Sequence, residues 1–93
     1  MKYGVYAIKD VKTGFLQPTV EMNDKVAIRN FAFAVHRTKD SLFYTFPEDY
    51  SLFRIGYYET DTGELERCDL EVLAPATYFI GDDPLDPMKV GEE

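Results

Sequence analysis

The clearest helical pattern in this chain begins at Asn23 and limits what the rest of the chain can form. Asn23 is a favourable residue to cap the first turn of a helix, and apolar residues recur after it at helical spacing. We expect a helix that opens at Asp24 and ends near His36, with a narrow polar face. The apolar positions are Val26, Ala27, Ile28, Phe31, Ala32, Phe33, Ala34 and Val35. A helix this apolar must lie closely on a sheet of its own chain or partly against a second subunit.

Segments with the composition of strands flank this helix on both sides. Residues 2–8 are rich in β-branched and aromatic residues, and a turn over 10–14 leads to a returning strand over 15–20. Pro18 cannot donate to a ladder, so this strand should lie at a sheet edge or break at that position. Residues 52–58 and 64–73 form the second pair, and their turn ends at Gly63. Glycine suits both turns because it adopts the positive φ that closes a bulged hairpin.

The order of these segments predicts an α+β domain over residues 1–80. Its antiparallel sheet comes from two β-hairpins flanking one amphipathic helix, in the order ββαββ. Residues 38–50 form an aromatic connector, in which 47–50 suit one short helical turn with proline first. Residues 81–93 combine carboxylates, glycine and proline with few apolar groups, so we expect a flexible acidic C-terminal tail.

The residue content argues against several classes of protein. The chain has 93 residues and one cysteine, which leaves no internal disulfide and no multi-cysteine metal site. It has no apolar run of membrane-spanning length, no glycine-rich phosphate loop and no dinucleotide fingerprint. The single histidine, His36, has no nucleophile near it in sequence and suits the end of the helix. We therefore expect a soluble protein that is not an enzyme, with no catalytic residues, no metal site, no cofactor and no membrane partner.

The charges are divided unevenly along the chain. The net charge is −7, yet residues 1–39 carry seven basic and three acidic side chains. Residues 40–93 carry three basic and fourteen acidic side chains. The acidic total opposes DNA binding by bulk electrostatics, because affinity for phosphates depends on the cations placed against them. A mutually screened, solvated surface is the favoured explanation of the division, and a basic face left free for a polyanion is the alternative.

Single-stranded nucleic acid needs only aromatic platforms beside a modest positive groove. Because neighbouring residues of a strand face opposite sides, one of two adjacent tyrosines in the 52–58 strand should be exposed. The competing interpretation is that the tyrosines pack in the core. The candidate contacts with single-stranded DNA are Lys2, Lys9, Lys12, Arg29, Arg37, Arg54, Tyr57 and Tyr58.

The aromatic residues of the helix and connector suggest a second kind of surface. A small sheet covers only part of so apolar a helix, which favours a homodimer or a partner protein. The candidate interface residues are Phe31, Phe33, Phe43, Tyr44 and Phe46.

Three separated motifs carry a family resemblance. They are Met-Lys-Tyr-Gly-Val-Tyr-Ala-Ile-Lys-Asp-Val-Lys-Thr-Gly-Phe-Leu (1–16), Asn23-Asp24 through Ala27 to Arg29-Asn30-Phe31, and residues 49–56 with Thr62-Gly63. In this order they resemble the small nonstructural protein of gokushoviruses, which are single-stranded DNA phages of the Microviridae. The resemblance covers about residues 1–65 and does not extend to the C-terminal third.

The resemblance implies a protein of the infected host bacterial cytoplasm that is not part of the virion. It implies a role in viral DNA replication and single-stranded genome packaging, by binding DNA, the replication complex or packaging proteins. It supplies no catalytic residues. The alternative is a protein-binding homodimeric module that engages a viral initiator or host factor through its acidic or aromatic surface.

Overall fold

The computed structural model describes residues 1–37 and 41–80 and confirms the predicted α+β class. The strands are β1 (Lys2–Asp10), β2 (Gly14–Phe15), β3 (Thr19–Glu21), β4 (Tyr50–Glu59) and β5 (Leu65–Pro75). The helices are α1 (Asp24–His36) and the short α2 (Leu42–Thr45), with 3-10 turns η1 (Pro47–Asp49) and η2 (Ala76–Phe79). The predicted tail, 81–93, lies outside the described residues.

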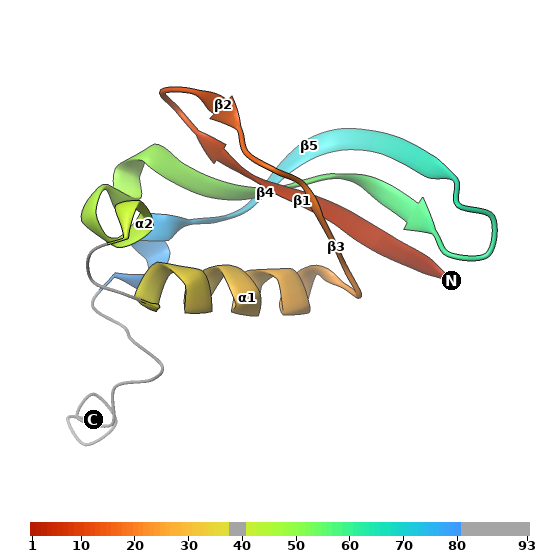
Figure 1. Cartoon of the computed structure of the whole chain (residues 1–93), viewed down its shortest axis with the longest axis horizontal. Coiled ribbons are helices and arrows are strands. Elements are labelled where there is room, and N and C mark those ends of the chain that lie inside the picture. The colour runs from red at the N-terminus through yellow and green to blue at the C-terminus, as the bar shows by residue number, and fades with distance from the viewer. Residues whose placement is uncertain (38–40, 81–93) are drawn as a thin grey trace, which may run out of the picture.

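The five strands form one antiparallel sheet in the order β2-β1-β4-β5, and β3 also pairs with β1 (Figure 1). The expected returning strand over 15–20 is divided into β2 and β3, with Pro18 between them. The break at this residue was one of the two predicted outcomes, since proline offers no N–H to the ladder. The divided strand leaves β1 in the middle of the sheet, between the short strands and β4.

Each turn glycine has the backbone conformation expected from the sequence. Gly14 has a φ of 107° and Gly63 a φ of 76°, and both values lie in the region that favours glycine. The Gly63 N–H donates to the Glu59 carbonyl at 2.8 Å, which closes the β4–β5 hairpin. The two turns therefore share one local requirement, a residue with positive φ.

Helix α1 begins where the sequence predicts. The Asn23 side chain accepts a hydrogen bond from the Val26 N–H at 2.9 Å, and Asp24 places a carboxylate in the first turn. At the other end the His36 Nε2 donates to the Phe79 carbonyl at 2.6 Å, which ties α1 to η2. The short helices α2 and η2 were not predicted. In α2, the Ser41 hydroxyl accepts the Tyr44 N–H and supplies a local cap.

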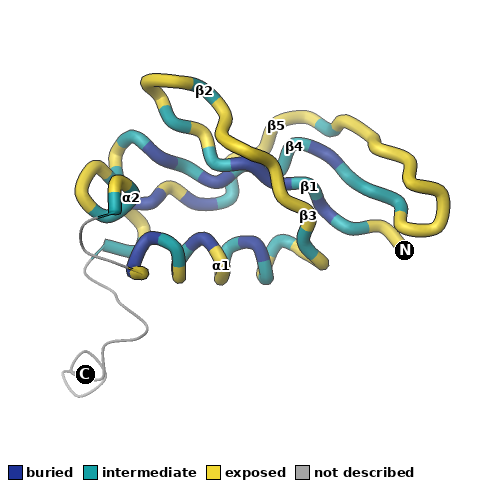
Figure 2. The backbone as a smooth tube through the Cα atoms, viewed as in Figure 1, coloured by how far each residue is buried: buried dark blue, intermediate teal, exposed yellow. Residues whose placement is uncertain are grey.

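Within the described residues, helix α1 covers one face of the sheet and no helix lies on the other (Figures 1 and 2). The buried core between them is small and partly aromatic, and it reaches from both central strands to η2. Its members are Tyr6, Ala27, Phe31, Val35, Tyr50, Leu52 and Ala76. We call the covered side the helix face and the opposite side the open face.

Gly4 allows the Tyr6 ring to lie flat along β1. A Cβ atom at Gly4 would meet the Tyr6 Oη at 2.1 Å, and Tyr6 is only 1% exposed and cannot swing away freely. We expect Gly4→Ala to lower the free energy of unfolding by about 1–3 kcal/mol, the usual cost of overpacking. Urea unfolding followed by circular dichroism measures the loss.

Ser51→Ala in β4 is the control, because it introduces the same residue into a strand without that clash. Its expected effect is within about 0.5 kcal/mol. Equal losses in both variants would contradict the assigned role of Gly4.

Candidate nucleic-acid interface

Strand pairing determines which side chains share the open face. In β1 the residues alternate, so Tyr3, Val5, Ala7 and Lys9 point away from the core residue Tyr6. Residues directly opposite in an antiparallel pair share a face, which extends the assignment to the other strands. The partners are Phe15 of β2, Val20 of β3, Ser51, Phe53, Gly56 and Tyr58 of β4, and Leu65, Arg67, Val72 and Pro75 of β5.

Four aromatic side chains lie on this open face in two pairs. Tyr3 stands directly opposite Tyr58 in the β1–β4 register. The Phe15 and Phe53 rings meet edge to face, with centroids 5.4 Å apart. Phe15 is 42% exposed, so part of its ring surface is open to solvent. These rings offer the flat apolar surfaces on which nucleic-acid bases stack.

The charged residues at the paired positions of the open face are both basic. Lys9 lies over the Phe15 ring, with its Nζ 5.6 Å from the centroid. Arg67 stands opposite Gly56 and is exposed. Within residues 1–37 and 41–80, neither Lys9 nor Arg67 forms an ion pair with a carboxylate. Their charges are therefore uncompensated by close acidic neighbours in this part of the chain.

Five of the six carboxylates of the strands lie on the helix face, and the sixth, Asp69 of β5, has no register partner. Register and alternation place Asp10, Glu21, Glu59, Glu66 and Glu71 there. The paired positions of the sheet thus place two cations on the open face, whereas the helix face carries five carboxylates together with the cations Lys2 and Arg54. A net charge of −7 for the whole chain hides this distribution.

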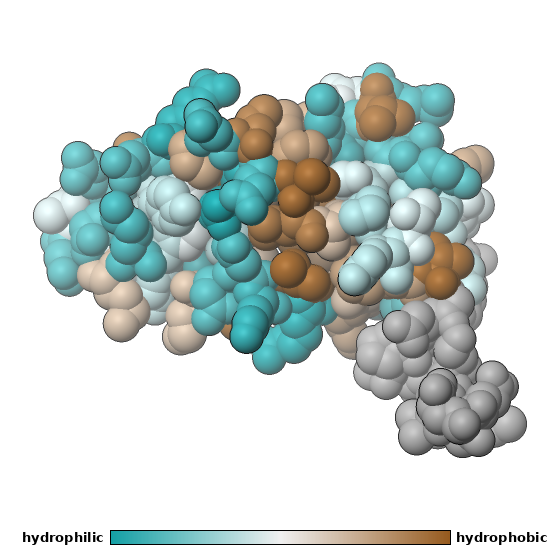
Figure 3. Space-filling view, turned by 180° about the vertical axis from the view of Figure 1, so that it is seen from behind, coloured by the Kyte–Doolittle hydropathy of each residue, from teal (hydrophilic) through white to brown (hydrophobic). Residues whose placement is uncertain are grey.

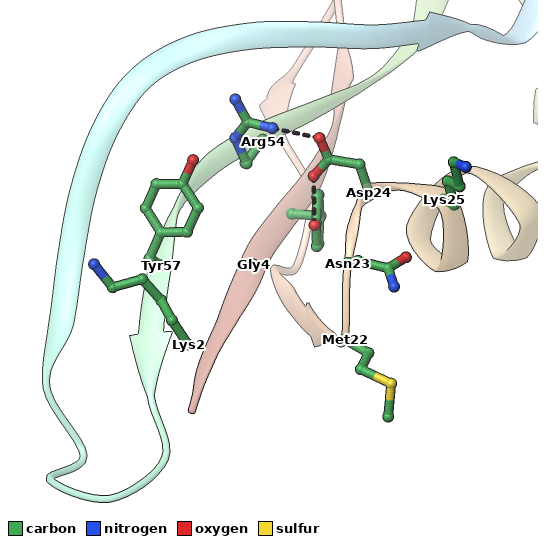
Figure 4. A pocket seen from close by; sticks show the side chains of 9 residues that line it. Lys2, Gly4, Met22, Asn23, Asp24, Lys25, Arg54 and Tyr57 are labelled. Carbon is green, nitrogen blue, oxygen red and sulfur yellow. Dashed lines mark hydrogen bonds and ion pairs between the residues drawn. The ribbon is translucent and has the colours of Figure 1, made fainter.

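Three of the predicted contact residues meet on the helix face, in an open groove of about 590 Å³ beside the first turn of α1 (Figure 4). Tyr57 forms one wall, with the Lys2 Nζ 5.5 Å and the Arg54 guanidinium 5.6 Å from its ring centroid. The cations in this groove already have acidic partners. Lys2 binds Glu66 at 3.1 Å, and Arg54 binds both Asp24 and Glu71 at 2.5 Å.

Asp24 holds this groove together. One of its oxygens accepts the Tyr6 hydroxyl at 2.7 Å, and the other accepts the Arg54 guanidinium. Burial raises the pKa of the Tyr6 hydroxyl, and the hydrogen bond to Asp24 raises it further. The same carboxylate raises the pKa of Arg54. These contacts join α1 to β1 and β4. The geometry therefore assigns Arg54 a structural role, and two carboxylates balance its positive charge.

The remaining predicted cations do not join either surface. Lys12 lies in the β1–β2 turn, where its N–H donates to the Asp10 carboxylate at 2.9 Å. Arg29 is on an exposed position of α1, and Arg37 follows the end of that helix. The eight candidate contacts are therefore divided between regions, with Lys9 and Tyr58 on the open face. Arg67, Phe15, Phe53 and Tyr3 were not among the predicted contacts. Their grouping with Tyr58 depends on the register between strands and on the irregularity within β4, which alternation along one strand does not reveal.

The aromatic residues predicted for an interface are also divided. Phe31 is 3% exposed and belongs to the core, so it is not available at the surface. Phe43 and Tyr44 are half-buried and pack against that core, with the Phe43 and Tyr50 rings 4.8 Å apart. Phe33 and Phe46 are each 51% exposed.

Comparison with known proteins identifies the family. A family model described as "Phage ORF5 protein" matches residues 3–79. The chain belongs to the Phage ORF5 protein family. The match includes α1 and all of the strands except Lys2, the first residue of β1, so both faces of the sheet lie within the part that this family defines. Neither a search of curated proteins nor a search of solved structures returned a match.

Two further properties of this Phage ORF5 family member bear on its class. Among the helices of residues 1–37 and 41–80, none is long and apolar enough to cross a membrane. In the same residues, no three histidine, cysteine or acidic side chains gather in a way that would hold a metal ion.

Removal of the Tyr6 hydroxyl tests the contact with Asp24. We expect Tyr6→Phe to lower the free energy of unfolding by about 1 kcal/mol at neutral pH, the usual net contribution of a hydrogen bond. The substitution should also change how the free energy of unfolding falls at alkaline pH. A tyrosine with a raised pKa in the folded state stabilises the fold below its unfolded pKa of about 10, and this contribution is lost as pH rises further.

Urea unfolding at pH 7 and at steps above pH 10 measures both effects. Above pH 10 the wild-type protein should lose up to about 1.4 kcal/mol per pH unit more than Tyr6→Phe. Tyr3→Phe is the control, since it removes a phenol that does not contact Asp24. An identical alkaline response of Tyr6→Phe and wild type would contradict the assignment.

Proposed function

We propose that this phage accessory protein binds single-stranded DNA on the open face of its sheet. The observation that carries the proposal is the combination of two aromatic pairs with Lys9 and Arg67 on a face that bears no carboxylate at its paired positions. Stacking on aromatic rings beside a positive surface is the usual basis of single-strand recognition. Membership of a phage protein family supports a role in the viral life cycle.

The proposed role is non-enzymatic and belongs to viral DNA replication and single-stranded genome packaging. It is supported by the resemblance of residues 1–65 to the small nonstructural protein of gokushoviruses, whose genome is single-stranded DNA. Under this proposal the protein works in the host bacterial cytoplasm and is not part of the virion. Replication or packaging proteins of the phage would be its further partners.

The open face fits single-stranded DNA better than duplex DNA. Two uncompensated cations and a net charge of −7 give little attraction for the dense phosphate array of a duplex. Stacking on the exposed aromatic rings requires unpaired bases, and only a single strand presents such bases.

A matched pair of charge reversals tests the location of the site. Lys9→Glu/Arg67→Glu reverses two cations of the open face, and Lys25→Glu/Arg29→Glu reverses two exposed cations of α1. Both double variants change the net charge by the same amount. We expect the open-face variant to bind a labelled oligothymidine at least about tenfold more weakly than the α1 variant, as measured by fluorescence anisotropy at low salt.

The salt dependence gives a second measure. For single strands the slope of log affinity against log salt concentration is about −0.7 per phosphate contact. Loss of two contacts should therefore make the slope less steep by about 1.4. Equal weakening by both double variants would show that only net charge matters and would contradict the site. Absence of binding by the wild-type protein at low salt would contradict the function itself.

Removal of one aromatic ring from the open face tests the contribution of stacking to DNA affinity without changing any charge. Phe15→Leu keeps an apolar side chain but removes the aromatic surface beside Lys9. We expect an affinity loss of about fivefold or more, because stacking contributes about 1–3 kcal/mol per base, with no change in the salt slope. Phe33→Leu on α1 is the control, since Phe33 is also exposed but lies on the helix. Equal binding by Phe15→Leu and Phe33→Leu would contradict a stacking role.

A further inference from the structure

β5 forms one edge of the sheet, so one side of its main chain has no strand beside it. Among residues 1–37 and 41–80, its ladder partner is β4, and no other element forms a backbone hydrogen bond with it. Most of β5 is exposed, as Figure 2 shows along the length of the strand. Unpaired N–H and C=O groups at an edge are ready to pair with another extended chain.

The side chains of β5 differ between its two faces. Leu65 and Val72 lie on the open face and are 71% and 55% exposed. Glu66 and Glu71 lie on the helix face. Seen from behind in Figure 3, hydrophobic side chains gather across the middle of the molecule, between hydrophilic regions. The edge therefore presents two exposed apolar residues, with Arg67 between them, on one face and two carboxylates on the other.

The edge has more carboxylates than basic residues to balance them. Between residues 59 and 71 the chain has six carboxylates and one basic residue, Arg67. Lys2 and Arg54 engage Glu66 and Glu71, whereas the exposed Glu64 and Asp69 form no ion pair within the described residues. A segment that pairs with β5 would therefore meet uncompensated negative charge.

A second copy of β5 is a poor occupant of this edge. In the antiparallel register that places Leu65 against Val72 of the copy, Glu66 stands opposite Glu71 on both sides of the axis. Like charges directly opposite each other destabilise a strand pair. The charge pattern favours a partner whose residues are basic where those of β5 are acidic.

We propose that β5 receives a short extended segment of another protein by strand addition, in which apolar and basic residues alternate. Main-chain hydrogen bonds to the free edge supply affinity, and the alternation of the side chains supplies selectivity. The apolar residues of the segment lie beside Leu65 and Val72, and its lysine or arginine residues face the carboxylates. Register shifts between β4 and β5 interrupt the edge, which limits the added segment to a short one.

The test uses the full chain and a short synthetic peptide of alternating valine and lysine. Binding of the labelled peptide is measured by fluorescence anisotropy, and a peptide with glutamate in place of lysine is the probe control. We expect binding of the lysine peptide, much weaker binding of the glutamate peptide, and slowed hydrogen exchange of β5 amides in the complex.

Two identical substitutions locate the binding edge. Val72→Lys alters β5, whereas Val20→Lys alters β3, which pairs with β1 away from β5, and both valines are exposed residues of the open face. We expect Val72→Lys to weaken peptide binding by about tenfold and Val20→Lys to leave it nearly unchanged. Circular dichroism of both variants verifies that they fold.

Three results would overturn the proposal. They are the absence of peptide binding by the wild-type protein, equal weakening by the two valine variants, and a dimer of the free protein that Val72→Lys disrupts. The last result would assign the edge to a second copy. None of these results decides whether single-stranded DNA binds, because that site also uses Lys9 and Phe15, which lie outside β5.

Discussion

The Asp24 carboxylate is the contact on which the arrangement of this protein depends. It accepts hydrogen bonds from Tyr6 of β1 and Arg54 of β4 while it stands in the first turn of α1. These bonds hold the start of the helix against the two central strands, and Arg54 continues the chain of contacts to Glu71 of β5. The only long helix of the described residues is thereby held to one face of the sheet, and no helix of those residues covers the other face.

The same contacts determine which charges remain available. Lys2 and Arg54 are engaged by carboxylates on the helix face, whereas Lys9 and Arg67 face away from those carboxylates. Strand alternation is the physical cause, because it sends neighbouring residues to opposite sides. An acidic chain can in this way present a locally basic, aromatic surface, and net charge alone is a poor guide to what such a chain binds.

Much of the fold could be predicted from local chemistry. Asn23, Pro18, Gly14 and Gly63 each impose a backbone requirement that does not depend on distant residues, and the structure confirms all four. The grouping of site residues was harder to predict, because it depends on register. Lys2 and Lys9 lie on the same strand yet on opposite faces, and Arg54 has an acidic partner 30 residues away. Phe31 was predicted for an interface from helical spacing, but η2 packs over it and encloses it in the core. No local feature of the sequence predicted the position of η2.

The central position of β1 has a consequence for how the chain folds during synthesis. β2 and β3 can pair with β1 as soon as the first hairpin is made, because their partners are close in sequence. The other side of β1 must wait for β4, whose residues are some fifty positions later in the chain. Until then β1 is itself an open edge. Such non-local pairing is slow, because the chain loses entropy on closing the loop before the stabilising contacts between the strands form. The nascent chain therefore passes through a period in which its central strand is accessible, and rapid completion of β4 protects it from pairing with other chains.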